Sequence, residues 1–181
     1  MTPQRRLYVS MIMSLDGYID GPNHELDWFD DGNPQFERYC DEMIDSVGFA
    51  VYGRRSYELM VQYWPTAEGA FARKMNALPK AVLTKTLTEA TWSNTRIVRD
   101  VAEIAALKAE PGKPIVAWAG AELVAALTAA GLVDEYRLVV HPVVLGGGTR
   151  LFAGVTSSRP LRQVRMQSLG GRVTVLCYEP A

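Results

Sequence analysis

Short apolar segments with the length of β-strands alternate along this chain with segments that have the periodicity of helices. Strands are predicted at 6–15, 49–52, 80–84, 96–98, 114–119 and 135–145, and helices at 33–48, 54–63, 67–77, 100–111 and 121–130. Two further strands, 162–168 and 172–179, flank Gly170-Gly171, a pair typical of hairpin turns. This order predicts an α/β fold, with helices on both faces of a mostly parallel sheet and an antiparallel C-terminal hairpin at one edge.

The composition agrees with one globular domain, 1–181, and argues against several classes of protein. The formal net charge is −1, whereas nucleic-acid binding needs clustered Lys and Arg, so no nucleic-acid partner is expected. No apolar segment is long enough to span a membrane, and the first residues lack the pattern of a signal peptide, so we expect a cytoplasmic protein. With 2 distant cysteines and 2 histidines, no metal site is expected.

Four segments that follow predicted strands are candidates for ligand binding, because ligands of open α/β sheets bind beyond the carboxyl ends of strands. They are the Gly- and Asp-rich loop 16–32 and the segments 53–57, 84–86 and 119–122. The loop could cover a flat ring and exclude water, and the other three are suited to phosphate groups. Taken singly, each is also compatible with an ordinary surface loop or strand–helix connection. A fifth segment, 141–152, has three glycines that could form an anion-holding nest, although its His141 is of a kind that is more often structural.

Eight short motifs occur in a characteristic order along nearly the whole chain. They are Ser14-Leu15-Asp16-Gly17-Tyr18-Ile19, Leu26-Asp27-Trp28, Gly53-Arg54-x-Ser56-Tyr57-Glu58, Tyr63-Trp64-Pro65, Lys80-Ala81-Val82-Leu83-Thr84, Gly120-Ala121-Glu122-Leu123, Gly131-Leu132-Val133-Asp134-Glu135 and the segment 141–152. In this order they resemble stand-alone members of the bacterial riboflavin-biosynthesis reductase C-terminal domain family. The resemblance implies a dihydrofolate-reductase-like three-layer sandwich.

The same resemblance implies NADPH as hydride donor and assigns the strand ends to parts of it. By position, it places Ile19, Asp20 and Gly21 beside the nicotinamide ring, and Thr84 and Lys85 at the adenosine 2′-phosphate. It places two groups at the pyrophosphate. These are Gly53, Arg54 and Ser56, which also lie at the nearby ribose, and the helix amides of Gly120, Ala121 and Glu122. The turn that contains Ala119, Gly120 and Ala121 lacks the hydroxyl or second glycine common in the family. Weaker phosphate binding is therefore expected there.

The expected function is NADPH-dependent reduction of a small heterocyclic or carbonyl substrate, pterin-like or ribosylaminopyrimidine-like. Asp16 is the acid nearest the nicotinamide end and the candidate for proton supply or substrate orientation. The acids that follow Trp28 are Asp30, Asp31, Glu37 and Asp41, and none is an unambiguous match to the pterin-binding carboxylate of folate reductases. Two alternatives remain, an inactive nucleotide-binding or regulatory module and a flavin-binding protein. The resemblance also implies a homodimer that pairs through sheet-edge strands and the C-terminal hairpin.

Overall fold

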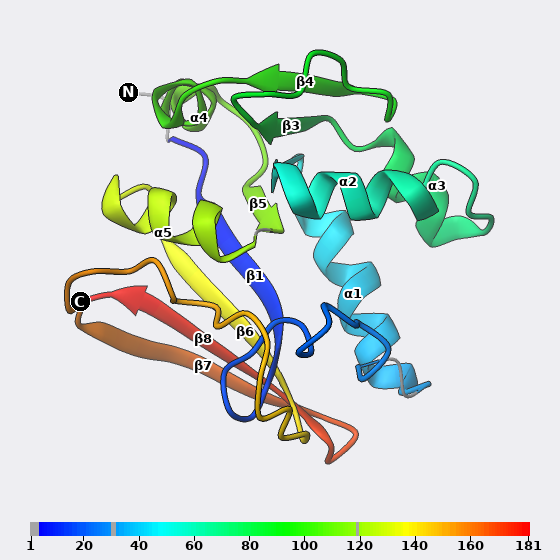
Figure 1. Cartoon of the computed structure of the whole chain (residues 1–181), viewed down its shortest axis with the longest axis vertical. Helices are drawn as coiled ribbons and strands as arrows, with labels where there is room; N and C mark the ends of the chain where they lie inside the picture. Colours follow the sequence, from blue (N-terminus) through cyan, green and yellow to red (C-terminus); the bar gives the residue numbers. More distant parts are fainter. Residues whose placement is uncertain (1–3, 30–31, 119) are drawn as a thin grey trace.

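The computed structural model of the chain describes residues 4–29, 32–118 and 120–181. The elements in these residues are β1 (Leu7–Ser14), α1 (Pro34–Ser46), β2 (Phe49–Gly53), α2 (Arg54–Tyr63), α3 (Ala70–Ala77), β3 (Lys80–Leu83), β4 (Thr95–Val98), α4 (Val101–Ala109), β5 (Ile115–Trp118), α5 (Ala121–Ala129), β6 (Glu135–His141), β7 (Leu161–Leu169) and β8 (Val173–Pro180). Within the described residues, the eight strands form one sheet in the order β4-β3-β2-β5-β1-β6-β8-β7 (Figure 1).

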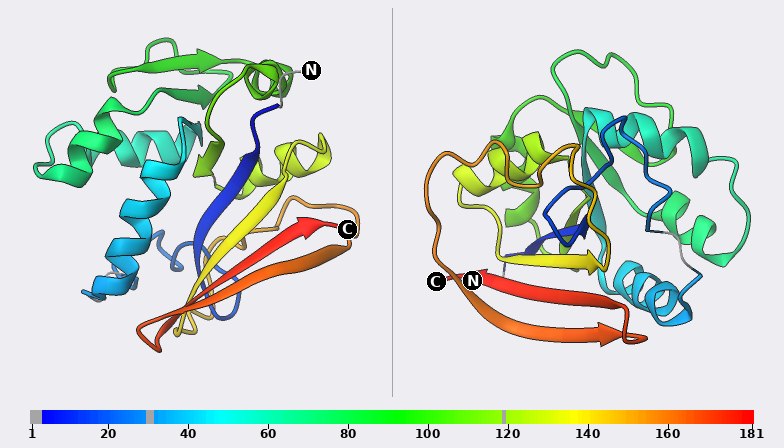
Figure 2. Two further views of the ribbon diagram at one scale, coloured as in Figure 1. Left: turned by 180° about the vertical axis from the view of Figure 1, so that it is seen from behind. Right: turned by 60° about the horizontal axis from the view of Figure 1, so that its bottom comes forward.

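The pairing of the strands confirms the predicted α/β architecture. The six strands from β4 to β6 in this order are parallel to their neighbours, whereas β8 pairs antiparallel with both β6 and β7. Figure 2 shows β7 and β8 as a hairpin along the outer side of the sheet. Its turn, Gly170-Gly171, has φ values of 63° and 70°, and positive φ at both central residues is what a tight hairpin turn requires.

Alternating residues of the central strands point to two separate cores, which makes the fold three-layered. On β1, Leu7 and Val9 pack in one core with apolar residues of α4 and α5. Tyr8 points to the other face, into a core that contains Met43 of α1 and Tyr57 of α2. Both faces of the central strands are therefore buried, which explains why their sequences are almost continuously apolar.

Local signals at the helix ends are confirmed. The Asn33 side chain accepts hydrogen bonds from the backbone N–H groups of Gln35 and Phe36 at the start of α1. Asp100 and Glu103 form the predicted capping box of α4. None of the helices in the described part of the chain has the length and apolar character needed to cross a bilayer.

Two predicted boundaries are wrong by more than two residues. The strand expected at 135–145 ends at His141, because Pro142 has no N–H for the ladder and the neighbouring β1 ends at Ser14, the pairing partner of His141. The helix expected from residue 67 begins only at Ala70. Gly69, with φ 103° and ψ 176°, has a backbone conformation that a helix cannot include.

Candidate functional site

The carboxyl ends of four neighbouring strands lie along one edge of the sheet. Because β1, β5, β2 and β3 are adjacent and parallel, the segments that follow them meet there (Figure 1). All of the site residues expected from the sequence belong to these four segments. The predicted grouping of the segments is therefore present, although Ala119, which was assigned to the same edge, lies outside the described residues.

Two helix N-termini at this edge have no side chain that caps them. The N-cap residues of α2 and α5 are Gly53 and Gly120, and neither helix has a capping hydrogen bond from a side chain within the described residues. The two ends are close, because a Cβ atom added to Gly120 would lie 3.6 Å from the Oγ of Ser56. Free N–H groups at helix N-termini attract anions, so this pair of ends suits a diphosphate group.

Three cationic side chains lie around the end of β3. Arg54 donates from Nη1 to the Oγ1 of Thr86 at 2.7 Å, and Arg99 donates from Nη1 to the carbonyl oxygen of Thr84 at 2.9 Å. Lys85, between those two threonines, is exposed. Sequence reasoning missed Arg99, although it directly follows β4, the neighbour of β3, and the same strand-end rule would have included it.

Thr84, which was expected to contact the adenosine 2′-phosphate, is buried, and its hydroxyl is used within its own turn. It is only 5% exposed, and its Oγ1 accepts hydrogen bonds from the backbone N–H groups of Thr86 and Leu87. The hydroxyl therefore shapes the turn that presents Lys85. The exposed cations at this turn are the side chains of Lys85, Arg99 and Arg54, of which Arg54 is also paired with Glu58 at 3.2 Å.

The first half of the loop after β1 is fastened to the segment after β6 by a carboxylate. Asp16 accepts hydrogen bonds from the Oγ of Ser14 at 2.7 Å and from the backbone N–H groups of Leu145 at 3.1 Å and Gly146 at 2.8 Å. The hydrogen bond from Ser14, together with those from Gly146 and Leu145, lowers the pKa of Asp16 to about 2. Asp16 is therefore ionised near neutral pH in this structure, and its hydrogen bonds favour the orienting role over proton supply.

A second carboxylate, that of Asp20, joins the loop after β1 to the segment after β6 at Thr149. Asp20 accepts hydrogen bonds from the backbone N–H of Thr149 at 2.5 Å, from its Oγ1 at 3.0 Å and from Nδ1 of His24 at 2.7 Å. Burial acts to raise the pKa of Asp20, but the bonds from His24 and Thr149 outweigh it and lower that pKa. The backbone N–H of Ile19 also donates to the carbonyl of Thr149, so residues 19–21 are held in a defined position at the edge of the sheet.

The second half of the loop places aromatic rings on a buried histidine. His141 is 2% exposed, and its ring lies 5.8 Å from that of Trp28, 6.1 Å from that of Phe29 and 5.2 Å from that of Phe36 in α1. The four rings form an apolar wall beside the end of β1, whose Ser14 is the partner of His141 in the sheet. Such a wall suits a flat, largely apolar ring and helps to exclude water.

The structure does not single out one carboxylate after Trp28 for substrate binding. Asp30 and Asp31 lie outside the described residues. Glu37 is exposed in the first turn of α1, and Asp41 is paired with Lys74 at 2.7 Å. In the described part of the chain, no group of three or more His, Cys, Asp or Glu side chains could hold a metal ion.

A direct measurement can check the ionisation of Asp16. In a carbon NMR titration, the carboxyl carbon of Asp16 is expected to titrate with a midpoint near 2, well below the ordinary value of 3.8. Since the folded pKa is the lower one, the contribution of this group to stability is complete above pH 3.8 and is lost as the pH falls towards 2. Ser14→Ala removes the largest cause and is expected to move the midpoint up towards 3.8, and a wild-type midpoint above 4 would contradict the geometry.

Comparisons with known proteins agree on one group of relatives. The family model described as the RibD C-terminal domain matches residues 5–175. Two curated relatives come from Bacillus subtilis (strain 168). "Uncharacterized protein YyaP" is 35% identical over 97% of this chain and 95% of its own length, and "Uncharacterized protein YwjB" is 26% identical over 94% and 95%.

Solved structures show the same fold at lower sequence identity. A putative riboflavin biosynthesis protein from Shewanella sp. PV-4 has a TM-score of 0.77 at 22% identity, covering 97% of this chain and 99% of that one. A deaminase/reductase from Thermotoga maritima has a TM-score of 0.70 at 12% identity, covering 98% of this chain and 57% of that longer one. Dihydrofolate reductase from Enterococcus faecalis, complexed with NADP(H), has a TM-score of 0.68 at 16% identity, covering 99% of both chains.

Proposed function

This chain belongs to the RibD C-terminal domain family, and on that basis we propose that it is an NADPH-dependent reductase of a small heterocyclic or carbonyl substrate. The observation that carries the proposal is the pair of glycine-capped N-termini of α2 and α5 at the edge of the sheet, with cationic side chains beyond them. A pterin-like or ribosylaminopyrimidine-like compound is the proposed substrate class. The presence of NADP(H) in the dihydrofolate reductase with this fold supports the choice of cofactor.

The residues at the two helix ends fit a dinucleotide diphosphate. Gly53 and Gly120 have no side chain that could cap the helices, so they leave the backbone N–H groups at the starts of α2 and α5 open to a ligand. In this proposal the amides after Gly120, including those of Ala121 and Glu122, and the hydroxyl of Ser56 bind the diphosphate oxygens. Arg54 follows Gly53 directly and adds a positive charge to the same group.

The cations around the end of β3 are proposed to select NADPH over NADH. Lys85 directly follows Thr84, Arg99 donates to the carbonyl oxygen of Thr84, and Arg54 donates to the hydroxyl of Thr86. A 2′-phosphate between them would be neutralised by at least two positive charges. NADH lacks this phosphate, so its binding would gain nothing from Lys85 or Arg99.

The chain itself would bind, orient and shield, while the bound nicotinamide supplies the hydride. Asp16 and Asp20 hold residues 17–21 against the segment 143–151, which fixes Ile19, Asp20 and Gly21 beside the proposed ring site. The rings of Trp28 and Phe36 cover the adjacent end of β1 and keep water out. Since Asp16 is ionised, its proposed role is to orient this loop and the substrate.

A thermal-shift titration tests the proposed cofactor. NADPH at about 100 times its dissociation constant is expected to add about 2.7 kcal/mol to the free energy of unfolding, which raises Tm by about 5–10 °C for a chain of this size. NADH at the same concentration is expected to give a smaller shift. Turnover is then measured as oxidation of NADPH with a panel of pterins, quinazolines, ribosylaminopyrimidines and small carbonyl compounds.

Matched variants separate the possible outcomes of this titration. Arg99→Gln is expected to weaken NADPH about tenfold, the equivalent of about 1.4 kcal/mol, and to leave NADH unchanged. No shift with millimolar NADPH or NADH would eliminate the proposal. A shift without oxidation of NADPH by any compound would favour the nucleotide-binding module, and a yellow protein as purified would favour the flavin-binding alternative.

A further inference from the structure

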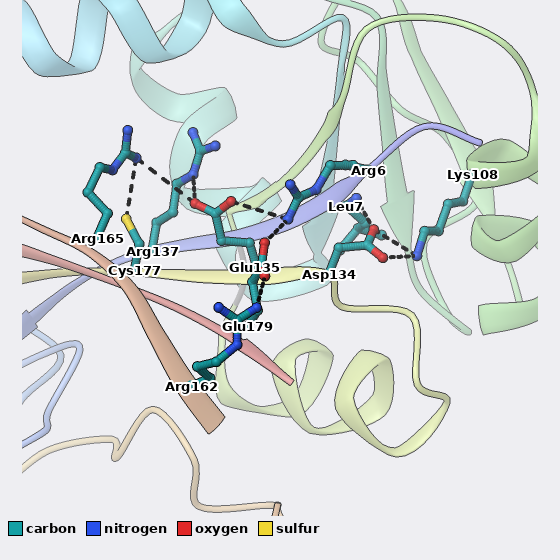
Figure 3. Close-up of polar contacts among 10 residues, drawn as sticks. All are labelled: Arg6, Leu7, Lys108, Asp134, Glu135, Arg137, Arg162, Arg165, Cys177 and Glu179. Atoms are coloured by element: carbon teal, nitrogen blue, oxygen red, sulfur yellow. Dashed lines mark hydrogen bonds and ion pairs between the residues drawn. The ribbon is translucent and has the colours of Figure 1, made fainter. Parts of the chain in front are cut away.

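The cations beside β6, β7 and β8 each have a carboxylate next to them (Figure 3). Glu135 and Glu179 are shared among the arginines of this region, which are Arg6, Arg137, Arg162 and Arg165. Lys108, in the same view, is paired with Asp134 at 2.8 Å. An incoming anion would therefore compete with carboxylates that are already in place.

Two other arginines, Arg5 and Arg96, differ from these. Their guanidinium carbons lie 5.5 Å and 5.1 Å from the centre of the Phe49 ring. Neither forms an ion pair with a carboxylate within the described residues. Burial lowers the pKa of Arg5, Glu110 raises it, and the charge of Arg96 lowers it again. Because the two positive charges repel each other, an anion beside them would be attracted by both.

A groove of about 460 Å³ lies next to Arg96, and this volume is typical of small-molecule sites. Phe49, Lys80 and Thr95, the first residues of β2, β3 and β4, are part of its lining. These strands are parallel, so the groove lies at their amino ends, opposite the edge that carries the proposed cofactor site. Its lining in the described part of the chain includes no acidic residue.

The wall of the groove, residues 90–96, is held in place by Asn76 of α3. The backbone carbonyl of Asn76 accepts hydrogen bonds from the Oγ of Ser93 at 3.2 Å and the Nδ2 of Asn94 at 3.1 Å. Its Oδ1 accepts from the Nε1 of Trp92 at 2.6 Å. The wall is therefore fixed before any ligand binds, which lowers the entropy cost of binding.

The backbone groups left free at the turn of this wall are donors. The carbonyl oxygen of Ser93 accepts from the Oγ1 of Thr95 at 3.4 Å, and that of Asn94 accepts from the backbone N–H of Lys80 at 2.8 Å. The backbone N–H groups of Ser93 and Asn94, in contrast, have no acceptor among the residues that the structure describes. Arg96 adds an exposed guanidinium. A site that offers donors and positive charge suits an anion.

From these observations we propose that the groove binds a small organic anion that carries a phosphate or carboxylate group. The guanidinium of Arg96 would hold this group together with the N–H groups of Ser93 and Asn94, since its fork matches both kinds of oxyanion. The charge of Arg5 would add to the attraction. The rest of the molecule would lie along the groove, whose volume exceeds that of a single phosphate ion.

Three aromatic probes of similar size test the role of charge. Phenyl phosphate, benzoate and benzyl alcohol carry about two, one and no negative charges near neutral pH. An NMR titration follows the Nε–H group of Arg96 and the backbone amides of 91–95. Phenyl phosphate, benzoate or both are expected to shift these signals, and the tighter of the two identifies the anionic group that the site prefers. Benzyl alcohol is expected to leave them unchanged.

The two ends of β4 provide a matched pair of variants. Arg96 lies in the groove, whereas Arg99 follows the other end of the strand at the proposed 2′-phosphate site. Arg96→Gln is expected to weaken the tighter probe about tenfold at the groove, and Arg99→Gln is expected to have no effect there. Thr91→Glu places a carboxylate in the groove and is expected to abolish binding while leaving the contact between Arg96 and Phe49 intact.

Several outcomes would overturn the proposal. They are shifts confined to the carboxyl ends of the strands, equal shifts with benzyl alcohol, a dissociation constant above about 10 mM for both anions, or unchanged binding in Arg96→Gln and Thr91→Glu. Circular dichroism and thermal melting confirm that each variant is folded. Because the signals report on the groove itself, the result is independent of whether the chain binds NADPH.

Discussion

A Gly148→Ala variant is expected to lose about 3 kcal/mol of its free energy of unfolding and to bind NADPH poorly. Gly148 has a φ of 118°, which L-residues rarely adopt, and this strain alone costs about 1–3 kcal/mol. The added Cβ would also collide with the backbone carbonyl oxygen of Asp20. Relief of the collision requires the loop to move away, which breaks the hydrogen bonds from Thr149 to Asp20 and displaces residues 19–21. Thermal melting with and without NADPH measures both effects.

The neighbouring glycine supplies the control for this effect. Gly146 also has a positive φ, 72°, but an added Cβ there would have no atom within 4 Å. Gly146→Ala is therefore expected to cost only the backbone strain, about 1 kcal/mol, and to leave the NADPH-induced rise in Tm intact. Equal losses in the two variants would show that the contact between Gly148 and Asp20 does not hold the loop.

A Lys80→Met variant is expected to be destabilised by a similar amount, about 3 kcal/mol. Lys80 is 1% exposed, and its ammonium donates to the carbonyl oxygens of Leu78 at 2.6 Å, Met75 at 3.0 Å and Asn76 at 3.2 Å, at the end of α3. It also lies 4.4 Å from the centre of the Trp92 ring. Methionine fills the volume but removes the donor from the buried carbonyl groups of Met75 and Leu78, and a buried carbonyl without a donor costs about 1–3 kcal/mol. Urea unfolding measures the loss, with the exposed Lys113→Met as control.

The same lysine makes stability depend on pH in the alkaline range. Burial lowers the pKa of Lys80 to about 8, whereas in the unfolded chain it is near 10.5. Between these values the unfolded chain binds more protons than the folded one, so the free energy of unfolding is expected to rise with pH from about 8 to 10.5. This rise should be absent from Lys80→Met, and a wild-type curve identical in shape to that of the variant would rule out the shifted titration.

Most elements of the fold could be predicted because their signals are local. The capping residues Asn33 and Asp100 act within one turn of helix, and Gly170-Gly171 acts within one hairpin turn. The strand predicted at 135–145 failed beyond His141 for a reason that is not local, since its length is set by where the neighbouring β1 ends.

The candidate site could be predicted as a set of segments but not as a set of contacts. Strand order alone brings the ends of β1, β5, β2 and β3 together, so their motifs were found from the sequence. The strand-end rule could have selected Arg99 as a residue, but it could not predict its hydrogen bond to Thr84. The two residues are 15 positions apart, and no sequence pattern in either segment indicates this contact. The buried hydroxyl of Thr84 could not be foreseen either, because the same residue could point into the turn or out of it.

The sequence by itself determined the order of strands and helices, the glycine turns at the ends of β2 and β5 and the likeness to a reductase family, because these depend on periodicity, turn residues and motif order. Only the tertiary structure decided what Asp16 contacts. Its carboxylate accepts hydrogen bonds from the backbone of Leu145 and Gly146 about 130 positions away, and these add to the larger effect of the nearby Ser14 hydroxyl in lowering its pKa. Protonation equilibria depend on neighbours in space, and residues so distant in the chain become neighbours only when the sheet has formed.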